Sequence, residues 1–282
     1  MNKKIITLVH MWGVGDGVMA YGLLKQIKFD RIYVYQKSSY NTLSKEYPAK
    51  VVHIPYRLAI LLLIIGRSIA GLKCGLIHPL DVNNKIGKIL LKLLKIFKVI
   101  VPINSKSLHR VDCLFDAYGK VRISINSRRE SINSVLDNNQ GKNFAIHLGG
   151  GGNSPKSFFK RIPSKTVKSI INKIESTNGR VVLFYGPGEE DISSERSIVP
   201  WSIDLEKKIV NSEFIYIGPD CGLAHYVAWY GGNVIELFGP TDSSLIGAQN
   251  ATWVQADIEC SPCYNSKLFD NCKNSKCLNT II

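Results

Sequence analysis

Residues 214–225 read FIYIGPDCGLAH, and this stretch decides the fold of the second half of the chain. An apolar, strand-like run passes through a Gly-Pro turn into Asp220, and a helical pattern follows directly. The first N–H groups of a helix are unpaired and carry about half a positive charge, and Gly222 would let a phosphate approach the backbone. The stretch therefore predicts an anion site. The alternative is that Asp220 only caps the helix and His225 lies on its surface.

The same order of strand, loop and helix continues on both sides of this stretch. Further strand-like runs that end in glycine-rich loops cover residues 144–148, 180–185 and 233–238. The first half opens in the same way, with strand-like runs at residues 4–9, 31–35 and 50–54. This order predicts an α/β protein with two doubly wound domains and a ligand cleft between them.

Length and composition agree with two globular domains. A chain of 282 residues corresponds to about two domains, and its 45% hydrophobic content excludes a disordered protein. A polar stretch at 133–142 predicts a linker, so we expect one domain over residues 1–138 and another over 139–282. The longest apolar run, 58–65, is far short of the ~20 residues of a membrane span, and residues 5–9 are too few for a signal peptide. We therefore expect a cytoplasmic protein.

The chain carries 36 basic and 22 acidic residues, a net charge of +14. Such an excess predicts an anionic partner, which could be nucleic acid, anionic lipid or a phosphorylated small molecule. The basic residues are not interleaved with aromatic ones as they are in a nucleic-acid-binding module. We therefore expect no nucleic acid.

One segment concentrates this charge. Residues 85–100 read KIGKILLKLLKIFKVI, and a helical projection puts five lysines on one side and the apolar residues on the other. Such a helix can lie at the surface of an anionic membrane, which predicts a peripheral membrane contact. The alternative is an ordinary amphipathic helix that packs on the sheet of the first domain.

The glycine loop near the N-terminus holds one candidate catalytic residue. Its Gly-x-Gly-x-Gly spacing differs from the dinucleotide-binding Gly-x-Gly-x-x-Gly, and Gln36 and Lys37 stand where a dehydrogenase would have an acid. We therefore do not expect an oxidoreductase. Asp16 is placed to act as a general base on a hydroxyl, or else it caps the helix that follows.

Charged residues also follow the glycine loops of the second half. Lys156, Lys160 and Arg161 lie after a run of four glycines, and their cations could neutralise a diphosphate leaving group. Glu189 and Glu190 come after another strand-like run, and they could bind ribose hydroxyls or be solvated.

Four of the seven cysteines lie close together, as Cys260-x2-Cys263-x8-Cys272-x4-Cys277. A Cys-x-x-Cys turn lets two thiolates reach one ion, and a second pair would complete a tetrahedral shell that suits zinc or iron. The residues between them are too polar to build a core, so a metal would supply folding energy. We expect a structural site. Disulfides and free thiols are the alternatives, and a cytoplasmic location disfavours stable disulfides.

Five motifs resemble, in order, those of glycosyltransferase family 9, the bacterial heptosyltransferases. They are GVGDGV at 13–18, KRIP at 160–163, DCGLAH at 220–225, LFGPTD at 237–242 and the Cys-x-x-Cys pair at 260–263. The resemblance covers most of residues 140–278, but only the initial loop of the first half. It implies a GT-B fold, in which two Rossmann-like domains face each other across a cleft. It also implies an inverting transfer with no catalytic metal.

The resemblance further implies roles for individual residues. Asp16 resembles the base that deprotonates the acceptor hydroxyl, and Lys160 resembles the phosphate-binding lysine. The implied nucleotide-sugar pocket comprises Glu190 as the ribose ligand together with Asp220, Cys221, Gly222, Leu223 and His225. Related autotransporter heptosyltransferases carry a four-cysteine iron site in this region, which suits iron as well as zinc.

The sequence departs from the family pattern at Cys221, which replaces Ser or Thr, and at Ile162, which replaces Trp. After Cys277 we expect no terminal helix. The implied function is transfer of a sugar, heptose from ADP-heptose, to a bacterial surface glycan such as lipopolysaccharide. Its acidic glycolipid acceptor would bind the basic first domain at the inner face of the membrane. Alternatives are a heptosyltransferase that acts on an autotransporter protein, a non-catalytic relative serving as a membrane-surface or assembly module, and another nucleotide-sugar enzyme such as an epimerase.

Overall fold

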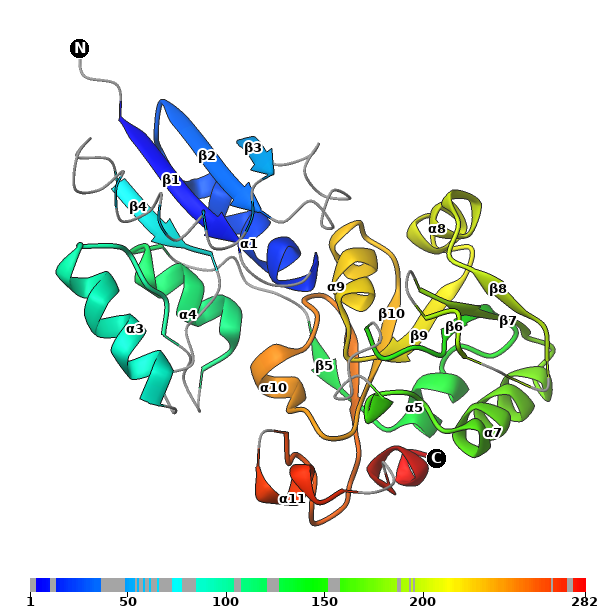
Figure 1. The fold of residues 1–282 in the computed structure, drawn as a ribbon. Helices are drawn as coiled ribbons and strands as arrows, with labels where there is room; N and C mark the ends of the chain where they lie inside the picture. Colours follow the sequence, from blue (N-terminus) through cyan, green and yellow to red (C-terminus); the bar gives the residue numbers. More distant parts are fainter. Residues whose placement is uncertain are drawn as a thin grey trace. The chain divides into compact units, whose positions relative to one another are not determined.

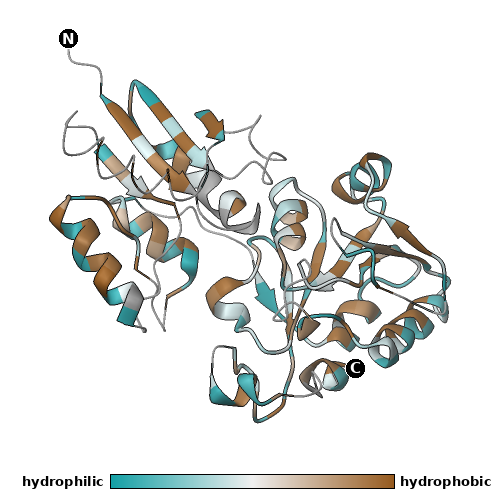
Figure 2. Ribbon diagram, viewed as in Figure 1, coloured by the Kyte–Doolittle hydropathy of each residue, from teal (hydrophilic) through white to brown (hydrophobic). Residues whose placement is uncertain are grey.

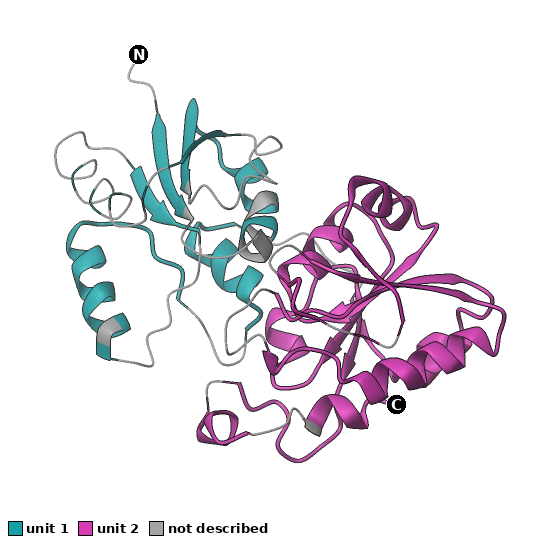
Figure 3. Ribbon diagram, turned by 45° about the vertical axis from the view of Figure 1, so that its right-hand side comes forward, with its two compact units in different colours: residues 1–124 teal, residues 125–282 magenta. Residues whose placement is uncertain are grey.

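The computed structural model divides into two compact units, residues 1–124 and 125–282 (Figure 3). Both units contain a parallel sheet and helices (Figure 1), which confirms the predicted α/β class. The residues that the structure describes are 4–10, 14–36, 49–53, 73–77, 85–103, 108–120, 127–151, 158–186, 189–192, 196–264, 266–272 and 276–282, with single positions at 55, 58, 61, 65 and 194.

Unit 1 is built on a four-stranded parallel sheet in the order β3-β2-β1-β4. Its described elements are β1 (Ile5–His10), α1 (Val14–Gln26), β2 (Arg31–Gln36), β3 (Lys50–His53), β4 (Lys73–Leu76), α3 (Lys85–Ile96) and α4 (Arg110–Ala117). The chain runs from β1 to β2 and β3 on one side and then to β4 on the other, so a switch point lies between β1 and β4.

Helix α3 is shorter than the sequence predicts. It ends at Ile96 rather than near residue 100, because the backbone turns at Lys98, which has a φ of 51°, and Val99 then enters the core. Leu94 packs in the same apolar cluster with residues of β1 and β4. Helix α3 therefore packs on the core of unit 1, as one of the two interpretations of this segment requires.

Unit 2 is built on a seven-stranded parallel sheet in the order β5-β11-β10-β9-β6-β7-β8. Its described elements are β5 (Arg128–Arg129), α5 (Ile132–Asp137), β6 (Asn143–His147), α7 (Ser164–Glu175), β7 (Arg180–Tyr185), β8 (Ile198–Pro200), α8 (Ile203–Val210), β9 (Ile215–Pro219), α9 (Gly222–Trp229), β10 (Val234–Phe238), α10 (Ser243–Ile246), β11 (Thr252–Gln255), α11 (Lys267–Asp270) and the 3-10 helix Lys276–Thr280. The chain runs from β6 to β7 and β8 and then crosses back to β9, so the switch point lies between β6 and β9.

The two faces of this sheet carry different side chains, because successive residues of a strand point to opposite faces. One face packs against α5, α7 and the C-terminal segment in a single apolar core that includes Phe144 and Ile217. The alternate positions hold His147 on β6, Tyr216 on β9 and Glu236 on β10. These three polar residues therefore share the opposite face, which is the face that α9 covers.

The polar stretch at 133–142 contains most of helix α5 rather than a linker. The helix begins after Ser131, whose hydroxyl accepts the N–H of Ser134 at 3.2 Å. Its three apolar residues are buried in the core of unit 2, and its polar residues are exposed. The two compact units meet between residues 124 and 125. The domain boundary expected at 138/139 stays a prediction.

Candidate functional site

The candidate site lies at the carboxyl edge of the unit 2 sheet, at the switch point between β6 and β9. Open parallel sheets bind ligands at this place, because the loops on the two sides of a switch point run apart. The loops after β6, β7, β9 and β10, together with the turn before α7, supply the residues of the site.

Lys160 and Asp220 form a mostly buried ion pair at this edge. The Nζ of Lys160 lies 2.7 Å from Oδ2 of Asp220 and 5.3 Å from the centre of the Tyr264 ring. Burial opposes both charges, but each charge stabilises the other, so the pKa of Asp220 is lowered and the pKa of Lys160 is raised. The predicted phosphate lysine is thus held at the start of α9.

Helix α9 presents the rest of the implied pocket. Cys221 is its N-cap residue and has an extended backbone. Gly222 and Leu223 form the first turn and are half-buried, whereas His225 is buried. The structure therefore brings together five of the six residues implied for the donor pocket and adds Lys160 to them.

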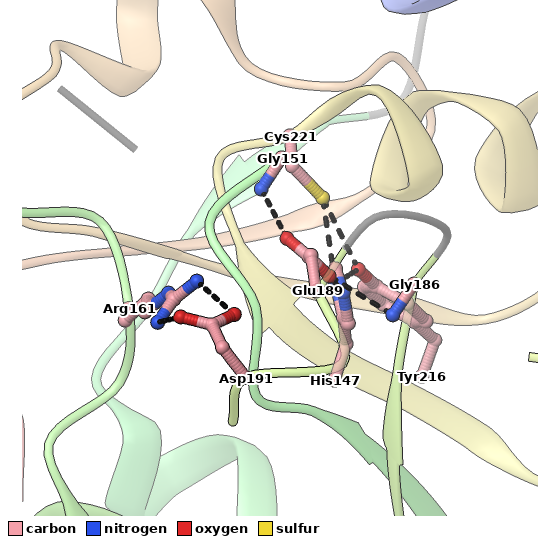
Figure 4. Close-up of polar contacts among 8 residues, drawn as sticks. All are labelled: His147, Gly151, Arg161, Gly186, Glu189, Asp191, Tyr216 and Cys221. Carbon is pink, nitrogen blue, oxygen red and sulfur yellow. Dashed lines mark hydrogen bonds and ion pairs between the residues drawn. The ribbon is translucent and has the colours of Figure 1, made fainter. Parts of the chain in front are cut away.

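Arg161 does not join this group. Arg161 makes a two-pronged ion pair with Asp191, with N–O distances of 2.9 and 3.0 Å (Figure 4), and it lies over the ring of Phe158. Lys156 lies outside the described residues. Arg161 therefore holds the loop after β7 in place, and it is Lys160 that reaches α9.

A buried carboxylate joins two of the loops at the switch point (Figure 4). Glu189 is 1% exposed, and it accepts the N–H of Gly151 at 2.8 Å and that of Gly186 at 2.9 Å. It also lies 2.7 Å from Nε2 of His147. The loops after β6 and β7 are therefore tied to one side chain.

His147 extends this network to β9. Its Nδ1 lies 3.0 Å from the hydroxyl of Tyr216 and 3.5 Å from Sγ of Cys221. Burial alone would lower the pKa of His147 and raise that of Cys221. The two groups stabilise each other's charge, so the pKa of His147 is raised and the pKa of Cys221 is lowered. A protonated His147 between the carboxyl group of Glu189 and the sulfur of Cys221 is therefore favoured at the start of α9.

Two glycines of the loop after β6 are required by this network. A Cβ atom at Gly149 would overlap the carboxylate of Glu189. Gly151 has a φ of +88°, and a Cβ there would lie 3.2 Å from the Cβ of Cys221. The glycine run in the sequence thus allows the loop to pass closely over both side chains.

Glu236 is a fully buried carboxyl beside Asp220. Its Oε2 accepts the N–H of Ala248 at 2.7 Å, and its Oε1 has no hydrogen-bond partner within the described part of the chain. Ligand atoms of Asp220, His225 and Glu236 lie within 4.8 Å of one another. Burial and the negative charge of Asp220 raise the pKa of Glu236 well above its usual value near 4.5. Because Lys160 already neutralises Asp220, we interpret Glu236 as a neutral carboxyl.

Glu190 and Asp16 are two further residues that the sequence predicts for the site. Glu190 is exposed, and it is the neighbouring Glu189 that is buried at the sheet edge. Asp16 lies in the first turn of α1 in unit 1, within the helix and not at its N-cap. Their roles as ribose ligand and general base stay predictions.

The C-terminal cysteines converge on one small cavity of about 70 Å³. Its walls are Phe159, Pro240, Phe269 and the thiols of Cys260, Cys263, Cys272 and Cys277. All four thiols are free, and burial next to the other cysteines raises the pKa of Cys263 and Cys277. No three of these sulfur atoms lie within 4.8 Å of one another, so side chains would have to rotate inward to form a tetrahedral shell.

Sequence reasoning missed His147, Tyr216 and Glu236 as site residues. Two of them carried a signal: His147 ends a strand directly before the glycine run, and Glu236 is a lone carboxyl inside an apolar strand. Tyr216 carried none, because a tyrosine in a strand is ordinary. Its role follows only from the pairing of β9 with β6.

Solved structures of glycosyltransferases are similar to the whole chain. A family 9 glycosyltransferase from Veillonella parvula is 14% identical, with a TM-score of 0.57 over 99% of this chain and 96% of its own. The E. coli ADP-heptose lipopolysaccharide heptosyltransferase II is 14% identical, with a TM-score of 0.56 over 99% and 98%. The iron-containing dodecameric heptosyltransferase TibC of enterotoxigenic E. coli, in complex with ADP-D-β-D-heptose, is 12% identical, with a TM-score of 0.57 over 99% and 76%. No protein-family model matches the sequence, and no curated protein matches it.

The fold is GT-B. Similarity at 12–14% identity shows the fold, and it confirms the fold class that the five motifs imply. The cleft that a GT-B fold would form between its two domains stays a prediction. Within the GT-B fold, the Lys160–Asp220 pair and the start of α9 lie at the switch point of the C-terminal unit.

The substitution Glu236→Gln is expected to reduce a pH dependence of the free energy of unfolding. Because the pKa of Glu236 is raised, the folded chain binds this proton more tightly than the unfolded chain does. The stabilisation is complete below pH 4.5 and is lost as the pH rises through the raised value, by at most about 1.4 kcal/mol per pH unit. Glutamine mimics the neutral carboxyl and does not titrate. Urea unfolding between pH 4.5 and neutrality measures the difference.

The matched control is Glu259→Gln at an exposed position, which should keep the wild-type pH dependence. Asp220 does not contribute to this pH dependence. Its pKa is lowered from 3.8, so its effect on the free energy of unfolding changes only at lower pH. An unchanged slope in the Glu236→Gln variant would mean that Glu236 is ionised in the folded protein.

Proposed function

We propose that the chain is a glycosyltransferase whose donor is a nucleotide-diphosphate sugar. The observation that carries this proposal is the Lys160–Asp220 ion pair at the N-terminus of α9, at the switch point of a GT-B fold. An ammonium and a helix N-terminus suit a diphosphate, which gains negative charge as its bond to the sugar breaks. Similar structures include heptosyltransferases in complex with ADP and with ADP-heptose, which supports an ADP-heptose donor.

In this proposal Lys160 neutralises the diphosphate and Asp220 positions Lys160. The buried carboxylate keeps the ammonium charged and fixes its place before the donor arrives, so little reorganisation is needed during the reaction. The first turn of α9, with Gly222 and Leu223, and the buried His225 complete the pocket. Lys160 supplies positive charge at the leaving group, and we expect no catalytic metal.

We propose Asp16 as the general base. It lies in the first turn of the helix that follows β1, next to the switch point of unit 1, and it matches the base in the family motif. Removal of the proton from the acceptor hydroxyl would let its oxygen attack the anomeric carbon on the side opposite the diphosphate. The new C–O bond forms as the bond to the diphosphate breaks, so the configuration inverts and a nucleoside diphosphate leaves.

For the acceptor we propose an acidic bacterial glycolipid, such as the core of lipopolysaccharide, met at the cytoplasmic face of the membrane. The net charge of +14 supports an anionic acceptor. A protein acceptor is the second candidate, favoured by the cysteine tail, which resembles that of autotransporter heptosyltransferases. A non-catalytic GT-B module is favoured only by Cys221, which replaces a hydroxyl residue of the family motif.

We also propose that the four C-terminal cysteines hold one structural zinc or iron ion. Their convergence on one small cavity supports this, as does the absence of a disulfide among them. Four thiolates would occupy every position of a tetrahedral ion, which leaves none for substrate. When bound, such an ion would supply cross-linking of the tail and no chemistry.

ADP is expected to stabilise the protein more than UDP or GDP in a thermal-shift panel, because the proposed donor is ADP-heptose. A ligand that binds only the folded state raises the stability of that state. Lys160→Ala should weaken ADP binding in calorimetry by about tenfold or more, since a hydrogen bond to a charged group contributes about 1.5–3 kcal/mol. His225→Ala should weaken it as well. Lys207→Ala, at an exposed position on α8, is the matched control and should bind as the wild type does.

Lys160→Arg keeps a positive charge beside Asp220 and should retain more ADP binding than Lys160→Ala does. Melting without nucleotide checks that each variant is folded. If no nucleotide stabilises the wild type, the non-catalytic module is favoured. If the variants change acceptor affinity alone, the assignment of unit 2 to the donor is wrong.

Asp16→Asn should lower kcat by about 10²–10⁴-fold and leave the Kd for ADP unchanged, because a general base acts on the acceptor. Steady-state kinetics with ADP-heptose and a lipopolysaccharide acceptor, combined with calorimetry, separate the two effects. Asp116→Asn on α4, an exposed aspartate of the same unit, should keep full activity. Full activity of Asp16→Asn would remove the catalytic role of Asp16.

Protein purified without chelator should contain about one zinc or iron ion per chain by elemental analysis. The double variant Cys260→Ser/Cys263→Ser should lose it and melt at a lower temperature, because the ion cross-links the tail. Cys113→Ala, in unit 1, should keep the metal. A folded, metal-free wild type with four titratable thiols in this tail contradicts the site.

A further inference from the structure

Helix α3 has two apolar faces with different surroundings. The inner face packs on unit 1, where Leu94 is 2% exposed and Leu90 is packed against the same cluster. The outer face carries Ile89, Leu93 and Ile96, which are 51%, 45% and 71% exposed. The sequence places all of these residues on one side of the helix, and the structure divides them between core and surface. Figure 2 shows the hydrophobic and hydrophilic residues along the ribbon of α3.

The exposed apolar residues form a continuous stripe. Ile89, Leu93 and Ile96 are separated by four and three positions, which places them above one another on a helix. A second exposed stripe runs beside the first, offset by about 90° around the axis. It consists of Lys85, Lys88, Lys92 and Lys95. The sequence contains no acidic residue between Asp81 and Asp112, so this segment is uniformly basic.

We propose that this face of α3 docks the protein on an anionic lipid bilayer. The apolar stripe would enter the boundary between headgroups and acyl chains, and the lysines beside it would bind headgroup phosphates. Lysine side chains are long enough to reach the headgroups while the helix lies in the plane of the interface. A soluble phosphorylated ligand would use the lysines alone and leave the apolar stripe in water, so the two stripes together favour a lipid surface.

A second copy of the chain fits this face less well, because pairing two such faces would bring two lysine stripes of like charge together. Among the described residues no helix is long and apolar enough to cross a bilayer. The contact is therefore peripheral and reversible. Unit 1 also exposes Leu58, Leu61 and Ile65, which adds apolar surface to the same unit.

The test is co-sedimentation of the full chain with vesicles of phosphatidylcholine alone or mixed with phosphatidylglycerol. The wild type should bind the mixed vesicles, and added salt should release it, because salt screens lysine–phosphate attraction. Two variants should each lower the partition coefficient by at least about tenfold. They are Ile89→Ser/Leu93→Ser/Ile96→Ser and Lys85→Gln/Lys88→Gln/Lys92→Gln/Lys95→Gln.

Matched controls come from exposed positions of unit 2 and should bind as the wild type does. They are Val199→Ser/Ile203→Ser/Leu268→Ser for the apolar stripe and Lys142→Gln/Lys165→Gln/Arg180→Gln/Lys207→Gln for the charge. Circular dichroism and melting temperature confirm that every variant is folded, which is expected since only exposed side chains change.

The proposal is overturned if the wild type does not pellet with mixed vesicles or if it binds neutral vesicles equally well. Binding that survives in the two α3 variants also overturns it. If the apolar variant instead changes the oligomeric state in gel filtration, a second copy covers the stripe and the bilayer assignment is wrong. None of these measurements involves sugar transfer, so they decide the docking surface independently of the proposed activity.

Discussion

The carboxyl edge of unit 2 depends on one buried carboxylate. Glu189 accepts two backbone N–H groups from two different loops and pairs with His147, which itself contacts β9. A charge without these partners would be costly at 1% exposure, since buried charges are tolerated only when they are paired and hydrogen-bonded. The pairing therefore fixes the positions of both loops, and the loop glycines make room for it.

The face of the unit 2 sheet that α9 covers carries several polar side chains, which parallel sheets ordinarily avoid. Strands buried on both faces are usually continuous apolar runs, yet His147, Tyr216 and Glu236 all lie on the face that α9 covers. His147 and Tyr216 lie within 3.5 Å of the sulfur of Cys221 at the start of α9. Glu236 lies beside Asp220. The polar groups thus gather around Cys221 and Asp220, while the opposite face of the sheet packs an apolar core.

The order of strands, glycine loops and helices was predictable because it depends on local composition and period. The motif around Asp220 was also predictable, since it directly follows a strand. The choice between Glu189 and Glu190 was not, because both follow the same strand and only the course of the loop decides which one turns inward. Helix α5 was not predicted for a related reason. Three apolar residues anchor it in the core, but the sequence around them is mostly polar. Similarly, helical period alone could not tell which leucines and isoleucines of α3 face the core.

The cysteine tail and the proposed phosphate site share a wall. The N–H groups of Cys263 and Tyr264 both donate to the carbonyl of Pro240, and the ring of Tyr264 lies beneath the ammonium of Lys160. Phe159, the residue before Lys160, lines the cysteine cavity. An ion that orders the tail would therefore also order the surroundings of Lys160. By thermodynamic linkage, the nucleotide would bind more tightly to the metal-loaded chain, and the metal would be retained more tightly by the same factor when nucleotide is bound.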